Sequence, residues 1–452
     1  MGADERLAGP IDPIFAVLKA AAGAAGARAF VVGGYVRDRL LGLRQPDIDV
    51  VVEGDALKLA EEFAGRAGAP APVVFERFGT AQVRSGDRLL EFASTRLESY
   101  APDSRKPAVS PASLEEDLRR RDFTVNALLM DFDGRVLDPL GTGLDDLEGR
   151  LLRTPDDPVR TFADDPLRML RGVRLAAQLD FQLHPSLLPA MRQLRDRARP
   201  PKLSVERATD ELRKLLAGPR PRTALELLDQ AGLLEILLPG VVAGKGVEQR
   251  GYHTHDVFGH TLLTVEKTPG ELITRLAALL HDVGKPKTAA PDGSFLGHEK
   301  VGAEIAREAL QRLRFSNEEV DRVVHLVRLH LRPVYYESDW SDGAVRKLIR
   351  DAGPDLDRLL DLARADIAAS AYDRPEKIDE LGERIRRLAA EQPSRFRVPV
   401  SGEDVMRELA LAPGPAVGRV KRRLDDLVLE GTLAPERDVL LEYLRQHPEL
   451  AE

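Results

Sequence analysis

FVVGGYVRDRLLGLRQPDIDVVVEG, from Phe30 to Gly54, is the stretch that decides the fold of this chain. It contains two short apolar runs, and Asp47 and Asp49 open the second one. That second run, residues 50–52, is typical of a buried strand, in which side chains two residues apart face the same way. Both carboxylates are therefore expected on one side of a sheet, where they repel each other unless a cation lies between them. Magnesium prefers such oxygen ligands together with substrate phosphates, so the pair predicts a Mg²⁺ site for phosphoryl transfer.

The first half of the stretch has the features of a phosphate cradle. Gly33 and Gly34 end a predicted strand, residues 29–32, and they leave out the Cβ atoms that would block a phosphate. A helix predicted for residues 35–41 would aim its N-terminal amides at that phosphate, and Arg37 would add a positive fork. Two glycines or one D-x-D motif are weak signals alone, but their order within so short a stretch predicts a nucleoside triphosphate site.

Composition restricts the class of protein. The chain has 452 residues, 43% of them hydrophobic and 31% charged, which indicates a globular protein of roughly two to four domains. It has no cysteine, so disulfides and thiolate zinc sites are excluded. No apolar run resembles a signal peptide or is long enough to span a membrane, which favours a cytoplasmic location. A net charge of −8 argues against indiscriminate nucleic-acid coating. Residues 192–222 nevertheless carry ten Arg and Lys against four Asp and Glu, as expected for a face that follows phosphates.

Helical and strand patterns organise the rest of the N-terminal part. Helices are predicted within residues 1–28 and at 55–68, strands at 72–79, 81–85 and 88–95, an exposed loop at 95–118, and a helix at 118–130. Glu91 is an acidic residue inside an apolar strand. Because a buried carboxylate without a partner is costly, Glu91 should face either solvent or a metal held with Asp47 and Asp49.

Five motifs occur here in a known order: GGYVRD, DID, RRRDFTVNA, DPLGTGLDDLEGRLLR and DDPLRMLRGVR. The chain resembles the class II tRNA nucleotidyltransferases, which are the CCA-adding enzymes and bacterial poly(A) polymerases of the polymerase-β superfamily. The resemblance implies an α+β fold, with a polymerase-β-like head built on a small mixed sheet, followed by an all-α neck, body, HD domain and tail. The corresponding boundaries are 1–153 for the head, 154–250 for the neck and body, 251–375 for the HD domain and 376–452 for the tail.

The resemblance also implies a role for each matched residue. The catalytic carboxylates would be Asp47, Asp49 and Glu91, and the first two would hold Mg²⁺. Asp146 and Arg153 would belong to the hinge motif that joins the head and the neck. Asp165 and Arg168 would read the Watson–Crick edge of cytosine or adenine, for which their acceptors and donors are suited. Asp164 stands where the family usually has glutamate, which could alter base selection. Ser204 and Arg207 belong to a motif that resembles the one closing the family's neck. A structural role at the start of a helix is enough to explain their presence. The full set expected to bind the nucleotide is Gly33, Gly34, Arg37, Arg121, Asp122, Asn126, Asp165, Arg168 and Arg171.

Histidines gather in the second half, where seven of the nine lie between His253 and His330. Their order with two aspartates resembles the HD phosphohydrolases, and nitrogen and oxygen ligands suit a divalent transition metal or Mg²⁺. Such a domain would hydrolyse phosphate esters, and a non-catalytic HD domain is the alternative. The expected ligands are His260, His281, Asp282, His298, His330 and Asp366.

The predicted function is template-independent addition of CMP and AMP from CTP and ATP to the 3′ end of tRNA, with release of pyrophosphate. Within the same chemistry, CC-only addition, A-only addition and poly(A) addition remain open. From other classes, an HD phosphohydrolase with an inactive, tRNA-binding head and a non-enzymatic RNA chaperone remain open. In the tail, residues 402–418 are predicted to form a helix, a turn and the start of a second helix, and a docking pair or a grip on tRNA would fit them.

Overall fold

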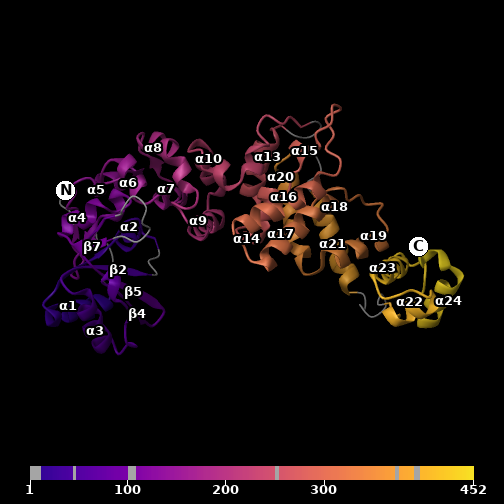
Figure 1. Ribbon diagram of the computed structural model, residues 1–452, viewed down its shortest axis with the longest axis horizontal. Coiled ribbons are helices and arrows are strands. Elements are labelled where there is room, and N and C mark those ends of the chain that lie inside the picture. Colours follow the sequence, from indigo (N-terminus) through magenta and orange to yellow (C-terminus); the bar gives the residue numbers. More distant parts are fainter. Residues whose placement is uncertain are drawn as a thin grey trace. The chain divides into compact units, whose positions relative to one another are not determined.

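A computed structural model describes residues 12–43, 47–99, 108–249, 254–371, 376–390 and 398–451. The chain divides between Leu237 and Leu238 into two compact units (Figure 1). No helix among the described residues is long and apolar enough to cross a membrane.

The first unit begins with a seven-stranded mixed sheet of order β3-β4-β5-β2-β1-β8-β9. Strands β2 and β5 are parallel and the other neighbours are antiparallel. The strands are β1 (Arg28–Val32), β2 (Ile48–Glu53), β3 (Val73–Phe75), β4 (Thr80–Ser85), β5 (Arg88–Ser94), β8 (Leu129–Met130) and β9 (Val136–Leu137). The small mixed sheet is confirmed, and so are the predicted strands, except that Glu76–Phe78 in the strand predicted at 72–79 form a 3-10 turn.

The two faces of the sheet have different partners. Helices α1 (Ile14–Ala25) and α3 (Ala56–Ala67) pack on each other, and α3 covers β4 and β5, where the Phe63 and Phe92 rings lie 5.6 Å apart. On the opposite face, Phe30, Val32 and Val51 form a buried cluster with Leu118 and Leu129. Side chains alternate along a strand, so Asp49 and Glu91 belong to this second face.

Two predictions for residues 95–130 were wrong. The stretch predicted as a loop contains a hairpin of β6 (Arg96–Ser99) and β7 (Ala108–Pro111), with residues 100–107 outside the described part. The helix predicted at 118–130 is instead the end of α4 (Leu114–Arg119), a 3-10 turn (Thr124–Asn126) and strand β8. Continuous burial from Phe123 to Met130 explains the change, because an apolar run can enter a sheet as readily as a helix.

Helices make up the remainder of the first unit, apart from a small parallel pair, β10 (Leu151–Leu152) and β11 (Gln182–Leu183). Helix α7 packs against α9 and α10, and α6 packs against α8. The helices are α2 (Gly34–Leu40), α5 (Gly143–Glu148), α6 (Pro158–Asp164), α7 (Leu167–Leu179), α8 (Leu187–Leu194), α9 (Val205–Ala217), α10 (Pro221–Gln230) and α11 (Leu234–Leu237).

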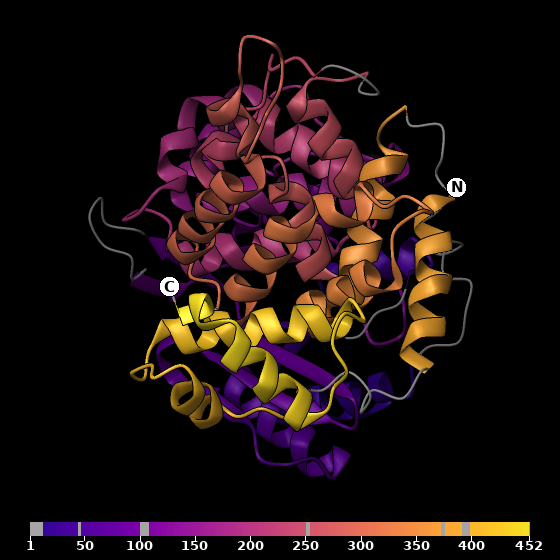
Figure 2. The same ribbon diagram turned by 90° about the vertical axis from the view of Figure 1, so that its right-hand side faces the viewer.

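The described residues of the second unit are helical, and α14, α17 and α20 form its centre by packing on one another. Its last helices, α22, α23 and α24, share a separate apolar core and form one cluster in Figures 1 and 2. The helices are α12 (Pro239–Val242), α13 (Val257–Lys267), α14 (Leu272–Leu280), α15 (Lys285–Thr288), α16 (His298–Arg312), α17 (Asn317–Leu329), α18 (Leu331–Val334), α19 (Asp342–Ala352), α20 (Leu356–Ala368), α21 (Lys377–Ala390), α22 (Gly402–Glu408), α23 (Pro415–Leu429) and α24 (Arg437–Gln446).

Candidate active site and metal centre

The central carboxylates of the first unit meet across two parallel strands. Asp49 on β2 pairs in register with Glu91 on β5, and both line a cavity of about 360 Å³. Gln82, opposite Glu91 on β4, donates a hydrogen bond from Nε2 to Glu91 Oε2 at 3.1 Å. Asp47 lies just before β2 and is exposed. Sheet pairing therefore brings Glu91 to Asp49 on a face that is open to solvent.

The electrostatics of Asp49 suit a group that awaits a cation. Burial in the cavity raises the pKa of the Asp49 carboxyl from its ordinary value, although part of the side chain remains exposed. The nearby Arg121 charge opposes this rise, while Glu91 and Asp47 add to it. A divalent cation would relieve the repulsion among three carboxylates and hold them ionised, so the donor set fits magnesium.

Gly33 makes the approach to Asp49 possible. Its φ of +78° is one that residues with a side chain rarely adopt, and a Cβ there would lie 3.2 Å from Asp49 Oδ2. Arg37 is buried, and its Nη1 donates to Asn126 Oδ1 at 2.6 Å while its Nε donates to Asp38. Arg37 is thus engaged in packing α2 against the 3-10 turn. Its contact with the triphosphate, like those of Gly33 and Gly34, stays a prediction.

A buried polar chain continues from Asn126 toward the neck. Asn126 donates from Nδ2 to Asp122 Oδ1 at 3.0 Å, and Arg171 on α7 donates from Nε to Asp122 Oδ2 at 2.8 Å. Burial alone would raise the pKa of Asp122, but the Arg171 charge and the hydrogen bonds outweigh it and lower that pKa. Asp122 is therefore an ionised link between the sheet domain and α7.

Neck residues complete the same cavity. Asp165, Arg168 and Arg171 line it with Asp49 and Glu91, and base reading by Asp165 and Arg168 stays a prediction. Arg207 on α9 also lines it and donates from Nη2 to Asp165 Oδ2 at 2.8 Å. The sequence predicted for Arg207 only a structural role at a helix start. The surplus of positive charge in residues 192–222 was the one sequence feature that pointed to a place in the cavity.

The expected hinge residues are paired. Arg153 Nη2 lies 2.9 Å from Asp146 Oδ1, and Asp146 Oδ2 accepts a hydrogen bond from Thr124 Oγ1 at 2.6 Å. Asp146 is buried, so the link ties α5 both to the 3-10 turn and to the segment that leads into the neck. This is a suitable place for a hinge, and the hinge motion itself stays a prediction.

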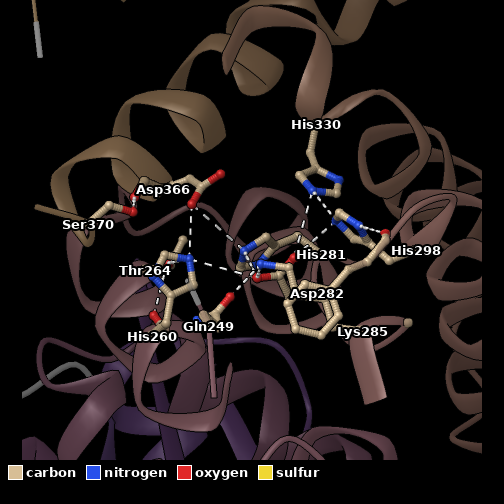
Figure 3. A network of polar contacts seen from close by, with 12 residues as sticks. Gln249, His260, Thr264, His281, Asp282, Lys285, His298, His330, Asp366 and Ser370 are labelled. Carbon is tan, nitrogen blue, oxygen red and sulfur yellow. Dashed lines mark hydrogen bonds and ion pairs between the residues drawn. The ribbon is translucent and has the colours of Figure 1, made fainter. Parts of the chain in front are cut away.

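In the second unit, the six predicted ligands lie together in one polar network (Figure 3). Among the described residues, two groups each place three ligand atoms within 4.8 Å of one another. The first is His260, His281 and Asp366, and the second is Asp282, His298 and His330. All six side chains are buried and come from α13, α14, α16, α17 and α20 or from the residues directly after them. Gly284 allows the close approach of α16, because a Cβ there would lie 2.2 Å from the His298 carbonyl oxygen.

The histidine rings are oriented as metal ligands. Nδ1 of His281, His298 and His330 each lies 2.6–2.7 Å from the carbonyl oxygen three residues earlier, to which only an N–H can donate. In the neutral rings of His298 and His330, Nε2 then carries a lone pair. The Nε2 atoms of His298 and His330 face each other at 3.3 Å, so two acceptors meet with no proton between them. A cation would resolve that repulsion.

Charge in this centre points to the same conclusion. Burial and the neighbouring His281 charge lower the pKa of His330 to about 3, so its ring is neutral at physiological pH. Burial would raise the pKa of Asp282, but His281 and Lys285 bring it well below its ordinary value. His281 Nε2 and Asp282 Oδ1 are buried without a hydrogen-bond partner in the described part of the chain. The donor set therefore fits a divalent metal.

Comparisons with known proteins agree with this architecture. The family model "Poly A polymerase head domain" matches residues 29–153, "Probable RNA and SrmB- binding site of polymerase A" matches 180–244, and the HD domain model matches 250–371. The chain is 36% identical to the A-adding tRNA nucleotidyltransferase of Deinococcus radiodurans, over 88% of this chain and 90% of that protein. It is 38% identical to the CC-adding tRNA nucleotidyltransferase of Thermus thermophilus, over 91% and 92%.

A solved structure is also similar. The Bacillus stearothermophilus CCA-adding enzyme in complex with CTP has a TM-score of 0.70 and 25% identity, over 97% of this chain and 98% of that one. The chain belongs to the class II tRNA nucleotidyltransferases and carries an HD domain. It is an enzyme with an α+β head followed by helical domains.

Proposed function

We propose that this enzyme adds CMP and AMP to the 3′ end of tRNA, using CTP and ATP and releasing pyrophosphate. The observation that carries the proposal is the pairing of Asp49 with Glu91 in a cavity that Asp165 and Arg168 also line. The names of the relatives support tRNA as the acceptor. A cytoplasmic location is part of the proposal, and its support is that the relatives are named as enzymes that act on tRNA.

Asp47 and Asp49 would hold Mg²⁺, which would supply charge neutralisation at the reacting phosphoryl oxygens. Glu91 would accept the proton of the tRNA 3′-hydroxyl. Gln82 would hold Oε2 of Glu91 through its hydrogen bond, which would leave Oε1 to accept that proton. Arg121 and Arg171, which line the same cavity, would bind the negative charge of the triphosphate. Asp165 and Arg168 would accept from and donate to the base edge. The protein would recognise tRNA by shape and phosphates.

A second candidate is an enzyme that adds only CC or only A. It is favoured by one observation, since the two relatives aligned over about nine-tenths of their length are named A-adding and CC-adding. Poly(A) addition has less support, because these relatives are named as tRNA nucleotidyltransferases and not as poly(A) polymerases.

The HD centre would hold divalent metal in its two ligand groups and hydrolyse phosphate esters. Its support is the buried six-ligand set beside a cavity of about 870 Å³, into which Lys285 also projects. Lys285 Nζ lies 2.6 Å from Asp282 Oδ2 and donates to Gln249 Oε1, which holds a positive charge at the edge of the cavity for an anionic substrate.

Incorporation of labelled CTP and ATP into tRNA, with pyrophosphate measured in parallel, tests the head. Activity that Asp49→Ala abolishes supports the proposal. Unchanged activity in that variant would contradict the role proposed for Asp49.

A further inference from the structure

Asp117 on α4 is the most deeply buried carboxylate of the head cavity, at 2% exposure. It lies on the cavity side of the short helix that follows the β6–β7 hairpin. A carboxylate at this depth is costly unless it is hydrogen-bonded and paired with positive charge. Its partners therefore determine what it does.

Those partners are two consecutive arginines. Arg120 Nη2 donates to Asp117 Oδ1 at 2.7 Å, and Arg121 Nη2 donates to Oδ2 at 3.3 Å. Each carboxylate oxygen thus holds one guanidinium. Both arginine side chains keep about a quarter of their surface exposed, and both line the cavity with Asp49 and Glu91.

Arg121 also lies close to the reaction centre. Its Nη1 would be 3.6 Å from a Cβ at Gly33, where Asp49 Oδ2 would be 3.2 Å away, and its charge acts on Asp49. An Arg121 side chain released from Asp117 would have the carboxylate of Asp49 close by in the same cavity. An ion pair between that arginine and Asp49 would neutralise the Asp49 carboxylate and remove a hydrogen-bond donor from the triphosphate.

We propose that Asp117 is a positioning residue that holds Arg120 and Arg121 toward the triphosphate and away from Asp49. This inference rests on the proposed function of the head. It assigns Asp117 to nucleotide binding through the two arginines, with no contact of its own to the substrate.

Asp117→Asn keeps the size of the side chain and removes its charge. We expect the KM for nucleotide to rise about tenfold, as for loss of a charge-assisted hydrogen bond, with kcat changed by less than about threefold. Glu115→Gln is the matched control, because Glu115 lies on the same helix and pairs with Arg119 at the surface. It is expected to behave as wild type.

Double-variant cycles separate positioning from general support of the fold. Asp117→Asn should cost less in an Arg120→Gln or Arg121→Gln background than in the wild type, because the shared partner is already gone. The rise in Tm that saturating CTP produces should shrink in Asp117→Asn, which gives a readout independent of turnover. If Asp117→Asn fails to fold, the two arginine variants still test the idea, since each should raise KM.

An unchanged KM in a folded Asp117→Asn variant, or full additivity in both cycles, would overturn the inference. So would an unchanged KM in both arginine variants. Lack of nucleotide incorporation by the wild type would instead contradict the proposed function itself, so the two failures are distinguishable.

Discussion

Asp49 and Glu91 lie directly opposite each other on the parallel strands β2 and β5. The two residues are far apart in sequence, and the sheet alone places their carboxylates on one face. Asp49→Ala should therefore reduce nucleotide incorporation by at least about a thousandfold, the effect of several kcal/mol of lost transition-state stabilisation. Single-turnover kinetics measures it. Asp133→Asn, which removes an exposed carboxylate paired with Lys19, should leave the rate unchanged.

The Asp122–Arg171 link predicts a pH-dependent stability. Asp122 has a lowered pKa in the folded chain, so its contribution is present above its ordinary value of 3.8 and is lost as the pH falls through the folded pKa. Asp122→Asn should lower the free energy of unfolding by about 2 kcal/mol at pH 7, less than for a fully buried pair because Arg171 is partly exposed. Urea unfolding at several pH values measures this. A difference from wild type that grows as the pH drops below 4 would contradict the account.

Arg207 is expected to influence base selection through its bond to Asp165. Arg207→Ala frees the Asp165 carboxylate, so the preference for CTP and ATP over UTP and GTP should fall about tenfold, in keeping with the loss of one charged hydrogen bond. Ratios of kcat/KM for the four nucleotides measure this preference. Arg160→Ala is the control, since Arg160 is exposed and makes only a long ion pair with Asp156. Equal selectivity in Arg207→Ala and wild type would refute the role.

The HD centre should retain metal independently of the head. We expect the dialysed wild type to bind up to two divalent ions per chain at its two ligand groups, and His330→Ala to lose at least one. Elemental analysis of the purified proteins gives the count. Nucleotide incorporation by His330→Ala should stay within about twofold of wild type, because the sites share no residues. Full metal content in His330→Ala would exclude it as a ligand.

Local sequence patterns were sufficient for parts of both sites. The HD ligands could be predicted because each stands at or near a helix end, and the order of His281, Asp282 and Asp366 marks a known arrangement. The strand that carries Asp49 was equally clear, since β-branched residues follow it directly. Motif order also grouped Asp165 and Arg168 with Asp49 and Glu91, and all four line one cavity, while their contacts with a nucleotide stay predictions.

Long-range pairing was beyond the sequence. Arg207 meets Asp165 only because α9 packs on α7, and the packing of two helices is not encoded in the charge of either residue. The helix predicted at 118–130 failed because burial on all sides of residues 123–130 gives no periodicity that separates helix from strand. The hydrogen bond between Arg37 and Asn126 could not be predicted either. It depends on the 3-10 turn Thr124–Asn126, which the helix predicted at 118–130 missed.

Incorporation of labelled CTP and ATP into three tRNA transcripts, ending before CCA, after C and after CC, tests the central claim most directly. The account predicts addition of C, C and then A, each step abolished by Asp49→Ala. Addition to only one class of transcript would identify a CC-adding or A-adding enzyme of the same chemistry. No incorporation into any transcript would contradict the assignment of Asp49 and Glu91 to nucleotidyl transfer.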